Sequence, residues 1–466
     1  YFTQANTVSQ GTINVTGYLG TVSAGGNGGA NVADAVKVTL GAGGVTTIDT
    51  SGANAFGAVA QSVGGGGGIV AISTRANYGN VKGVQLGQRG GNGMGMATTV
   101  TGAASIVTRG NNAFGIVAQS VSNGGGILAV ATPGLEFFTG TAILGARGGS
   151  GNNAGNATVN LSGGGGITTT GMFAHGIVAQ SIAGGGGISA LNTDTVQMGG
   201  GTAGIAGVTS VTALAPVATS GIGASAIVAQ SIGGGGGLAL TSYNAQFIST
   251  TGGSDASTVG VTTTGNGWLQ TTGNLGFGIL AQSIGGGGGA FIAPNHGVIA
   301  SFGASAAYAG GVYVDAGANV VTTGQGSTAI LAQSVGGGGG VIASSFADAA
   351  YTSYVANLYG SSGGSDYGSN VAVTTHGQTI ATGGANAAAV IAQSVGASGV
   401  YYAQTNTAAQ GSIHATFNLG SGLGSGNGGV SQSDSVKVTL GSGGATTIDT
   451  SGANAFGVVA QSVGAG

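Results

Sequence analysis

Residues 34–66 read DAVKVTLGAGGVTTIDTSGANAFGAVAQSVGGG, and the stretch returns 400 positions later as residues 434–466, DSVKVTLGSGGATTIDTSGANAFGVVAQSVGAG. The two copies differ at only five positions, which are 35, 42, 45, 58 and 65. The match extends upstream, where Tyr1 corresponds to Tyr401. Residues 1–466 are therefore predicted to form a single continuous repeat array, made of one 400-residue unit and the first 66 residues of the next. We expect this window to be part of a longer chain or one period of a fibre.

A shorter repeat lies inside the long one and is marked by Ala-Gln-Ser after aliphatic residues, usually before a run of glycines. The gaps between successive motif glutamines are 58, 61, 50, 52, 51, 60 and 68 residues, so the motif stays constant while the intervening segments vary in length. This pattern is typical of a structural repeat with loop insertions. The eight motif glutamines are Gln61, Gln119, Gln180, Gln230, Gln282, Gln333, Gln393 and Gln461.

The residues between the glycines favour strands over helices. Segments such as 36–40 (VKVTL) and 177–182 (IVAQSI) are rich in β-branched residues and are bounded by Gly, Asn or Asp. Short strands at regular spacing predict either a β-solenoid or a β-sandwich array. The β-solenoid is favoured because equivalent strands must stack and two-residue hairpin dipeptides such as Asn-Gly are lacking. The expected fold is all-β, a β-solenoid like a parallel β-helix, with ordered glycine-rich segments.

Large aliphatic residues stand two positions before and two positions after each motif glutamine, as Val178 and Ile182 do around Gln180. Because side chains alternate along a strand, these residues share a face with the glutamine. That face is predicted to be core, with the glutamine buried and its amide satisfied by a ladder of stacked amides or by loop backbone. The opposite face, with Ala and Ser, is also too apolar for water, so both faces should be covered. The functional alternative is that the glutamine binds a ligand through its side-chain amide.

Glycine runs follow most of the motifs at a constant phase, and apolar residues come directly after them. The simple interpretation is a flexible linker. The constant phase instead predicts ordered, side-chain-free strands or polyproline-II-like segments onto which a neighbouring sheet or chain packs. The runs occupy 64–68, 124–126, 184–187, 233–237, 285–289 and 336–340.

Composition excludes several classes of function. Charged residues make up 4% of the chain and 107 of 466 residues are glycine, so the surface must be formed by uncharged polar side chains and backbone. Such a surface favours association with neighbouring copies or chains. A net charge of −3 with seven scattered basic residues predicts no nucleic-acid binding. The absence of cysteine is compatible with export, and any membrane attachment is expected only through regions outside this sequence.

A search for chemistry finds no predicted catalytic, cofactor-binding or metal site, so the chain is not expected to be an enzyme. The ten acidic residues form no local carboxylate pair. The four histidines, which stand alone in the sequence, are expected on the surface or in turns: His175, His296, His376 and His414. Two Gly-Gly-Ser-Asp segments, 252–255 and 363–366, weakly suggest calcium but do not continue as tandem nonapeptides.

The element 173–182 (FAHGIVAQSI), followed by glycines 184–187 and preceded by 167–171 (ITTTG), resembles the glycine-rich repeats in passenger regions of large autotransporter-type surface proteins of Gram-negative bacteria. The resemblance covers the eight motif copies, roughly half of the chain. It implies an exported β-helix, often an adhesin or surface fibre, located outside the cell or at the bacterial cell surface. The seventh and eighth copies depart from the pattern, because Ala397 and Ala465 interrupt their glycine runs.

The first functional hypothesis is therefore a structural segment of a giant extracellular adhesin or surface filament, which acts through length, self-association and surface contact. A second hypothesis is a β-helical enzyme that acts on glycans. A third is a solenoid that binds ice or another ligand through threonine ladders. Carboxylates clustered in a groove would favour the enzyme, outward-aligned threonines would favour ice binding, and extensive contact between chains would favour the filament.

Overall fold

The structure is a computed structural model in which every regular element of the described residues is a β-strand, so the all-β prediction is confirmed there. Strands run parallel to their neighbours in each of five sheets. Parallel ladders between successive repeats favour a stacked array over the β-sandwich alternative, in which antiparallel pairs prevail. The described residues are 2–6, 18–19, 31–32, 35–74, 84–87, 93–131, 138–145, 152–191, 193–199, 204–241, 245–249, 254–265, 267–294, 298–302, 307–346, 366–396, 399–406 and 432–464.

The Ala-Gln-Ser segments form an eight-stranded parallel sheet, here called the motif sheet, to which each repeat contributes one strand. Its register places equal motif positions side by side, so that Gln180 pairs with Gln119 on one side and with Gln230 on the other. The aliphatic residues around each glutamine suit strands that are buried on both faces. The strands are β6 (Ala58–Val63), β11 (Ile116–Val121), β15 (Ile177–Ile182), β20 (Ile227–Ile232), β25 (Ile279–Ile284), β30 (Ile330–Val335), β34 (Val390–Val395) and β38 (Val458–Val463).

The ends of the glycine runs begin the strands of a second eight-stranded sheet, here called the glycine sheet. Equal positions are again in register, as in the pairing of Gly186 with Gly125 and Gly236. The runs are thus part of the parallel ladder. The strands are β1 (Phe2–Asn6), β7 (Gly67–Thr74), β12 (Gly125–Ala131), β16 (Gly186–Ala190), β21 (Gly236–Leu240), β26 (Gly288–Pro294), β31 (Gly339–Phe346) and β35 (Gly399–Asn406).

The segment before each motif strand belongs to a 14-stranded sheet, here called the outer sheet. Two long strands, β10 (Thr98–Thr108) and β14 (Ala157–Thr169), cross the whole width of this sheet, whereas the other repeats contribute a first and a second strand. The first strands are β4 (Val36–Leu40), β18 (Thr209–Ala213), β23 (Val259–Thr263), β28 (Val312–Ala316), β32 (Val371–Thr375) and β36 (Val436–Thr439). The second strands are β5 (Thr46–Thr50), β19 (Val217–Thr219), β24 (Trp268–Thr271), β29 (Asn319–Thr322), β33 (Thr379–Thr382) and β37 (Thr447–Thr450).

Two smaller sheets complete the described strands. The six-stranded sheet follows the glycine sheet along the chain and contains β2 (Tyr18–Leu19), β8 (Val84–Leu86), β13 (Phe138–Leu144), β17 (Thr193–Met198), β22 (Ala245–Ser249) and β27 (Val298–Phe302). The two-stranded sheet pairs β3 (Asn31–Val32) with β9 (Gly93–Met94).

The motif sheet is the central layer of the molecule. On one face, residues such as Ile116 pack with Ile106 of the outer sheet in a core that runs through all repeats. On the other face, residues such as Val117 pack with Ile127 of the glycine sheet. Every residue of β11, β15, β20, β25 and β30 is buried. The prediction that the motif strand is covered on both faces is therefore confirmed.

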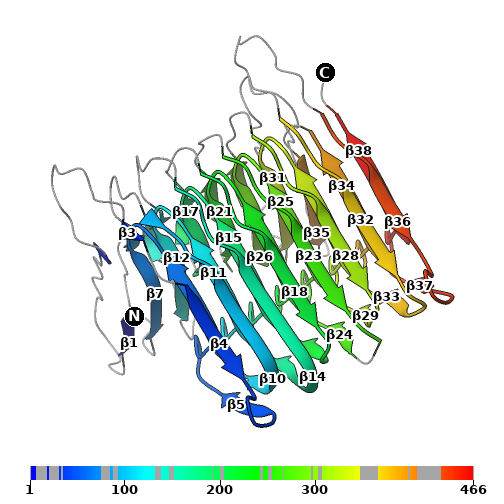
Figure 1. The fold of residues 1–466 in the computed structure, drawn as a ribbon, viewed down its shortest axis with the longest axis horizontal. Helices are drawn as coiled ribbons and strands as arrows, with labels where there is room; N and C mark the ends of the chain where they lie inside the picture. The colour runs from blue at the N-terminus through cyan, green and yellow to red at the C-terminus, as the bar shows by residue number, and fades with distance from the viewer. Residues whose placement is uncertain are drawn as a thin grey trace.

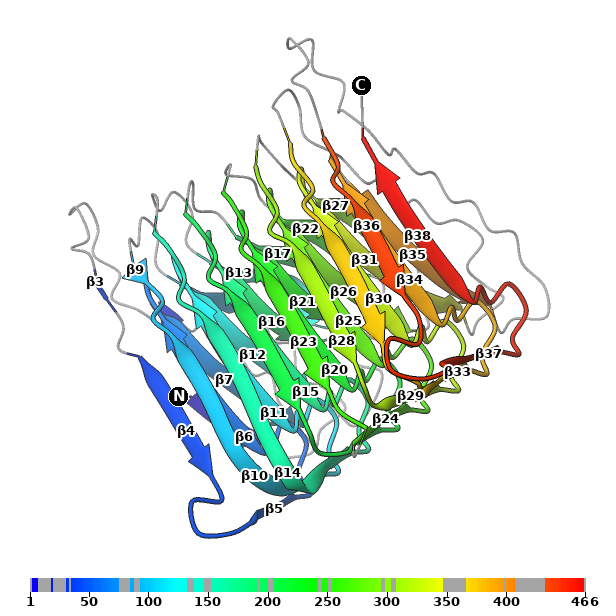
Figure 2. The same cartoon turned by 45° about the vertical axis from the view of Figure 1, so that its right-hand side comes forward.

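A further apolar layer lies between the glycine sheet and the six-stranded sheet, where Leu128 and Leu144 belong to one cluster. Successive repeats lie side by side along the long axis of the molecule, from the blue N-terminal strands to the red C-terminal ones (Figure 1). Figure 2 shows that the outer-sheet strand β4 and the motif strand β38 point in opposite directions, although neighbouring strands within each sheet are parallel. Each repeat thus contacts mainly the repeat before it and the repeat after it, as expected for a repeat array.

Candidate functional site

A ladder of side-chain amides runs through the motif sheet. At each of its seven steps the Nε2 of one glutamine donates to the Oε1 of the glutamine one repeat further along, over 2.7 to 2.9 Å. Five glutamines, from Gln119 to Gln333, are at most 1% exposed. Gln61 and Gln393 are half-buried, and Gln461 in the last described repeat is exposed. The predicted internal ladder is confirmed. The buried amides cannot contact a ligand, which the alternative interpretation of the glutamines required.

The serine after each glutamine joins the motif strand to the segment that enters the outer sheet. The Oγ of Ser181 donates to the carbonyl oxygen of Gly155 at 2.8 Å and accepts the N–H of Gly207 at 2.7 Å. These partners belong to successive repeats, so one hydroxyl bridges two repeats. Ser231 makes the equivalent pair of hydrogen bonds. The Ala-Gln-Ser motif is therefore explained by packing and internal hydrogen bonding.

Two further columns, which the sequence reading missed, lie in the turn before the motif strand. A threonine stands 11 positions before every motif glutamine and a glycine stands nine before it. The threonine Oγ1 closes the turn by donating to a backbone carbonyl, as from Thr219 to Ala224 at 3.0 Å and from Thr382 to Ala387 at 2.6 Å. The constant offset from the glutamine is the signal that would have revealed them. The threonines are Thr50, Thr108, Thr169, Thr219, Thr271, Thr322, Thr382 and Thr450.

The same turn contains a column of residues with positive φ, seven positions before each glutamine. Asn or Gly occupies six of the eight places, as the left-handed conformation favours. Phe173 and Leu275 hold φ values of 59° and 60° although each is buried. Their packing in the core beside the glycine sheet offsets a backbone cost of roughly 1–2 kcal/mol each.

The glycine runs are ordered, and close approach of backbone explains them. Gly126 has a φ of 126°, and a Cβ on it would lie 2.1 Å from the carbonyl oxygen of Gly68. Gly185 approaches another layer, because its Cβ would lie 2.8 Å from the Cα of Gly145, directly after the six-stranded sheet's β13. The linker interpretation is wrong for the described runs. Residues 397–398 and 465–466 of the interrupted runs lie outside the described residues.

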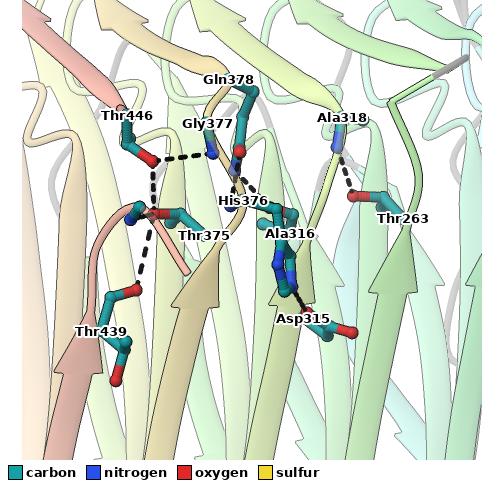
Figure 3. Close-up of polar contacts among 11 residues, drawn as sticks. Thr263, Asp315, Ala316, Ala318, Thr375, His376, Gly377, Gln378, Thr439 and Thr446 are labelled. Atoms are coloured by element: carbon teal, nitrogen blue, oxygen red, sulfur yellow. Dashed lines mark hydrogen bonds and ion pairs between the residues drawn. The ribbon is translucent and has the colours of Figure 1, made fainter. Parts of the chain in front are cut away.

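Stacking brings two acid–base pairs together on the surface. Arg109 contacts Asp49 through both guanidinium nitrogens, with Nη2 at 3.0 Å from Oδ2, and this hydrogen bonding lowers the pKa of Asp49. His376 Nε2 contacts Asp315, and neighbouring hydroxyls of Thr375 and Thr446 lie 2.7 Å apart (Figure 3). Each pair joins one acid to one base across adjacent repeats. These ion pairs link adjacent repeats. Neither pair contains the second carboxylate that glycoside hydrolysis normally requires.

The described parts of the two Gly-Gly-Ser-Asp segments serve the backbone. Asp255 Oδ1 accepts the N–H of Tyr308 at 2.9 Å, and Asp366 Oδ1 accepts the N–H of Ala307 at 3.2 Å. Residues 252–253 and 363–365 lie outside the described residues. Within the described part of the chain, no three His, Cys, Asp or Glu residues gather in a group that could hold a metal ion.

The expectation of surface or turn histidines holds for His376, which is exposed, whereas His175 lies in the turn before β15 but is fully buried. His175 lies in an aromatic column, with its ring centroid 5.5 Å from that of Phe114. Its Nδ1 accepts the N–H of Ser225 at 2.9 Å, which assigns the proton of the neutral ring to Nε2. Among the described residues Nε2 has no hydrogen-bond partner. Burial lowers the pKa of His175 to about 3, and His296 and His414 lie outside the described residues.

Acid is expected to destabilise the fold through His175. Between pH 6.5 and 3 the unfolded chain binds a proton on this residue that the folded chain does not, so stability falls as pH falls. The full loss would be about 5 kcal/mol near pH 3, and it would vanish above pH 7. The His175→Phe variant, which extends the Phe114 column, should lack this part of the acid response.

Urea unfolding at pH 7 and pH 4 measures the effect on His175. Equal acid responses of the unchanged chain and His175→Phe would contradict the assignment.

The solvent-facing side of the outer sheet carries a column of hydroxyl groups. Threonine occupies six of its eight positions, and the register places each directly beside the next. The adjacent outward column is irregular, because it includes Lys37, Gly260 and Tyr313. The eight residues of the hydroxyl column are Thr39, Thr101, Asn160, Thr212, Thr262, Asp315, Thr374 and Thr439.

Comparison of the chain with protein-family models, with curated proteins and with solved structures finds no match. Among the described residues there is no helix with the length and apolar character needed to cross a membrane.

Proposed function

We propose that this chain is a β-solenoid segment of a large extracellular adhesin or surface filament, which acts through its length, through self-association and through surface contact. In this proposal each repeat is one coil of the solenoid. The coils would advance by about 4.8 Å each, the usual spacing of paired strands, so eight repeats would extend about 38 Å. Further copies of the 400-residue unit would lengthen the segment in proportion.

The observation that carries the proposal is the equivalence of all seven junctions between repeats. Each junction uses the same glutamine hydrogen bond with the same direction, and the motif strands pair at the same register. An enzyme needs an active site where different functional side chains converge. The columns of the motif sheet instead repeat the same side-chain contacts at every junction. Repetition of this kind builds extent along an axis.

The location outside the cell is supported by the resemblance of the motif copies to autotransporter-type repeats. The absence of cysteine and the charged fraction of 4% agree with an exported structural chain.

Immunogold electron microscopy of the cells that produce the chain tests the proposal. Antibodies raised against residues 1–466 should label extended fibres outside the cells. X-ray diffraction from aligned fibres should show a strong reflection at about 4.7–4.8 Å along the fibre axis. Label confined to the cell interior, or to compact particles, would contradict the proposal.

A second candidate function is binding to an ordered surface such as ice, because the outward hydroxyl column meets the criterion of aligned threonines. Thermal hysteresis of the purified chain measures this activity. Thr212→Leu, which places a bulky residue in the column, should reduce it, while Thr447→Leu, outside that column, should not. A chain with no thermal hysteresis would exclude ice binding.

A further inference from the structure

We propose that the exposed ring of Tyr313 on the outer sheet forms a binding site for a neutral saccharide. The ring would stack on one face of a pyranose, and the side chains around it would form hydrogen bonds with the sugar hydroxyls. The inference rests on the proposed contact with surfaces and names the class of molecule that is contacted. The site is formed by three neighbouring strands in the interior of the array, β23, β28 and β32.

The ring of Tyr313 rises from a part of the outer sheet whose neighbouring outward residues are small. The register places Gly260 of β23 on one side of Tyr313 and Ala372 of β32 on the other. Neither neighbour has a side chain beyond Cβ, so neither covers the ring, and Tyr313 is 47% exposed. A single exposed tyrosine is ordinary on a protein surface, but glycine within a strand needs a reason.

Gly260 is a glycine that the packing of the sheet does not require. Its φ is not positive, and a Cβ added to it would meet nothing within 4 Å. Gly237, in contrast, is required by both its φ and its close contact with the next strand. Glycine within a strand costs roughly 0.5–1 kcal/mol relative to alanine, and one of its uses is to let a ligand approach closely. The open space beside Tyr313 therefore indicates room for a ligand that contacts the ring.

A second glycine, Gly311, permits the orientation of the ring. It lies two residues before Tyr313, at a position where the repeats on either side have Thr258 and Asn370. A Cβ on Gly311 would lie 2.7 Å from the Oη of Tyr313, so the outer part of the ring lies against the backbone of Gly311. A side chain at this position would displace the ring. The two glycines together set the direction of the ring and leave the space beside it open.

Hydrogen-bonding groups surround the ring on the same face of the sheet. Thr262 and Thr374 lie diagonally across from Tyr313 on the two neighbouring strands, and both are partly exposed. Asp315 follows Tyr313 by two residues and contacts His376 through Oδ1 (Figure 3). Hydroxyl groups donate and accept hydrogen bonds, and a carboxylate accepts them. These groups can therefore bond to the several hydroxyls of one sugar.

One aromatic ring within a polar surround is complementary to a saccharide. A pyranose has C–H groups on its faces and hydroxyls around its edge, and the negative face of an aromatic ring attracts C–H groups. A protein partner would need a well-packed contact on the order of 1,000 Å² with an apolar centre, which Gly260 and Ala372 do not supply. The carboxylate of Asp315 disfavours an acidic sugar, so a neutral one is expected.

Saturation-transfer difference NMR on the full 466-residue chain tests the site. The probes are hexasaccharides of glucose, mannose, galactose and N-acetylglucosamine. At least one should receive magnetisation on the C–H protons of a pyranose face, with a dissociation constant of about 1 mM, as a shallow site allows. Tyr313→Ala should raise that constant about tenfold or more, whereas Tyr313→Phe, which keeps the ring, should still bind.

Gly260→Val separates binding from stability, because it fills the space beside the ring without entering the core. It should weaken binding about tenfold or more and leave the urea unfolding midpoint unchanged or higher, since valine favours a strand. A residue with only a structural role would not lose binding while the fold is kept. Ser210→Val is the matched control, because Ser210 holds the same outward position one repeat before Gly260, and it should bind as the unchanged chain does.

No transfer to any of the four sugars would overturn the proposed site, and so would equal binding by the unchanged chain and Gly260→Val. Equal loss of binding in Ser210→Val would assign the contact to the sheet surface in general and overturn the role of Tyr313. Transfer to tetramethylammonium but to no sugar would assign the ring to a cation instead. Extracellular fibres without sugar binding would retain the proposed function and reject only this site, whereas sugar binding without fibres would do the reverse.

Discussion

Alanine at Gly237 is expected to destabilise the glycine sheet by about 4 kcal/mol or more, the size of effect reserved for severe local damage. Gly237 has a φ of 135°, and a Cβ added to it would lie 2.0 Å from the carbonyl oxygen of Gly187 in the neighbouring strand. That backbone region is essentially restricted to glycine, and the strand beside it is held by the parallel ladder. Either the two strands separate or Gly237 leaves its conformation, and both outcomes break the ladder.

Gly260→Ala is the matched control, because Gly260 also lies within a strand, β23, but an added Cβ would meet nothing within 4 Å. That substitution should leave stability unchanged or raise it by about 0.5–1 kcal/mol, since alanine loses less backbone entropy on folding. Hydrogen exchange measured by peptide should show lost protection in residues 225–241 and in the adjoining strands for Gly237→Ala only. Damage should fade with distance along the array, as interactions are mainly between neighbours.

Similar stability of the two glycine variants would mean that the runs tolerate side chains and that the linker interpretation deserves renewed weight. Retained protection in β16 and β26 with loss only in β21 would place the cost in one strand rather than in the ladder. Similar stability would contradict close packing of the glycine backbones. Loss of protection in β21 alone would confine the effect of that packing to one strand.

The motif strand could be predicted from sequence because its signal repeats in every copy. Large aliphatic residues on both sides of each glutamine defined the buried face, and burial required partners for the amides, either one another or loop backbone. The glycine runs were predictable as ordered elements for the same reason, since a flexible linker has no cause to keep a constant phase. These inferences concern single columns, in which each residue is compared with its equivalents.

The layer order could not be predicted in this way, because it depends on which faces meet. The outer sheet has strands of unequal length, and β10 and β14 continue where other repeats have two strands. The positive-φ column could not be predicted because it contains Phe173 and Leu275. Phe and Leu rarely adopt the left-handed conformation, so they do not indicate such a turn. His175 was expected on the surface or in a turn because it stands alone in the sequence, and its burial depends on packing against residues such as Phe114. How far the side chains at these positions are buried depends on how the sheets pack against one another.

The outer surface differs in kind from the interior columns. Within the motif strands the same residue type recurs at nearly every level, whereas on the outer sheet the column that begins with Lys37 changes to Ser210, Gly260 and Tyr313. In the motif columns each residue contacts its own equivalent, as the glutamines of the ladder do. Variable outward positions instead distinguish one repeat of the array from another.

Replacement of one interior glutamine by leucine should lower the free energy of unfolding by about 2–5 kcal/mol. An interior position tests the ladder directly, because its glutamine has a glutamine partner on each side. Gln230→Leu removes an acceptor from Gln180 and a donor from Gln282, and both of those amides are fully buried. An unpaired buried polar group costs about 1–3 kcal/mol, and two such groups remain after this change. The extra apolar contact of leucine offsets only part of that cost, because the flanking positions are already closely packed.

Gln461→Leu is the control for Gln230→Leu, because Gln461 is exposed and water can replace the hydrogen bond that it accepts from Gln393. Its effect should stay below about 1 kcal/mol. Urea unfolding gives the loss of stability, and hydrogen exchange should place the weakened amides in β15, β20 and β25. If leucine is tolerated equally at both positions, the amide ladder contributes little to stability and the aliphatic columns alone hold the motif sheet. If only the interior change is costly, the direction and continuity of the ladder are part of what makes successive repeats stack.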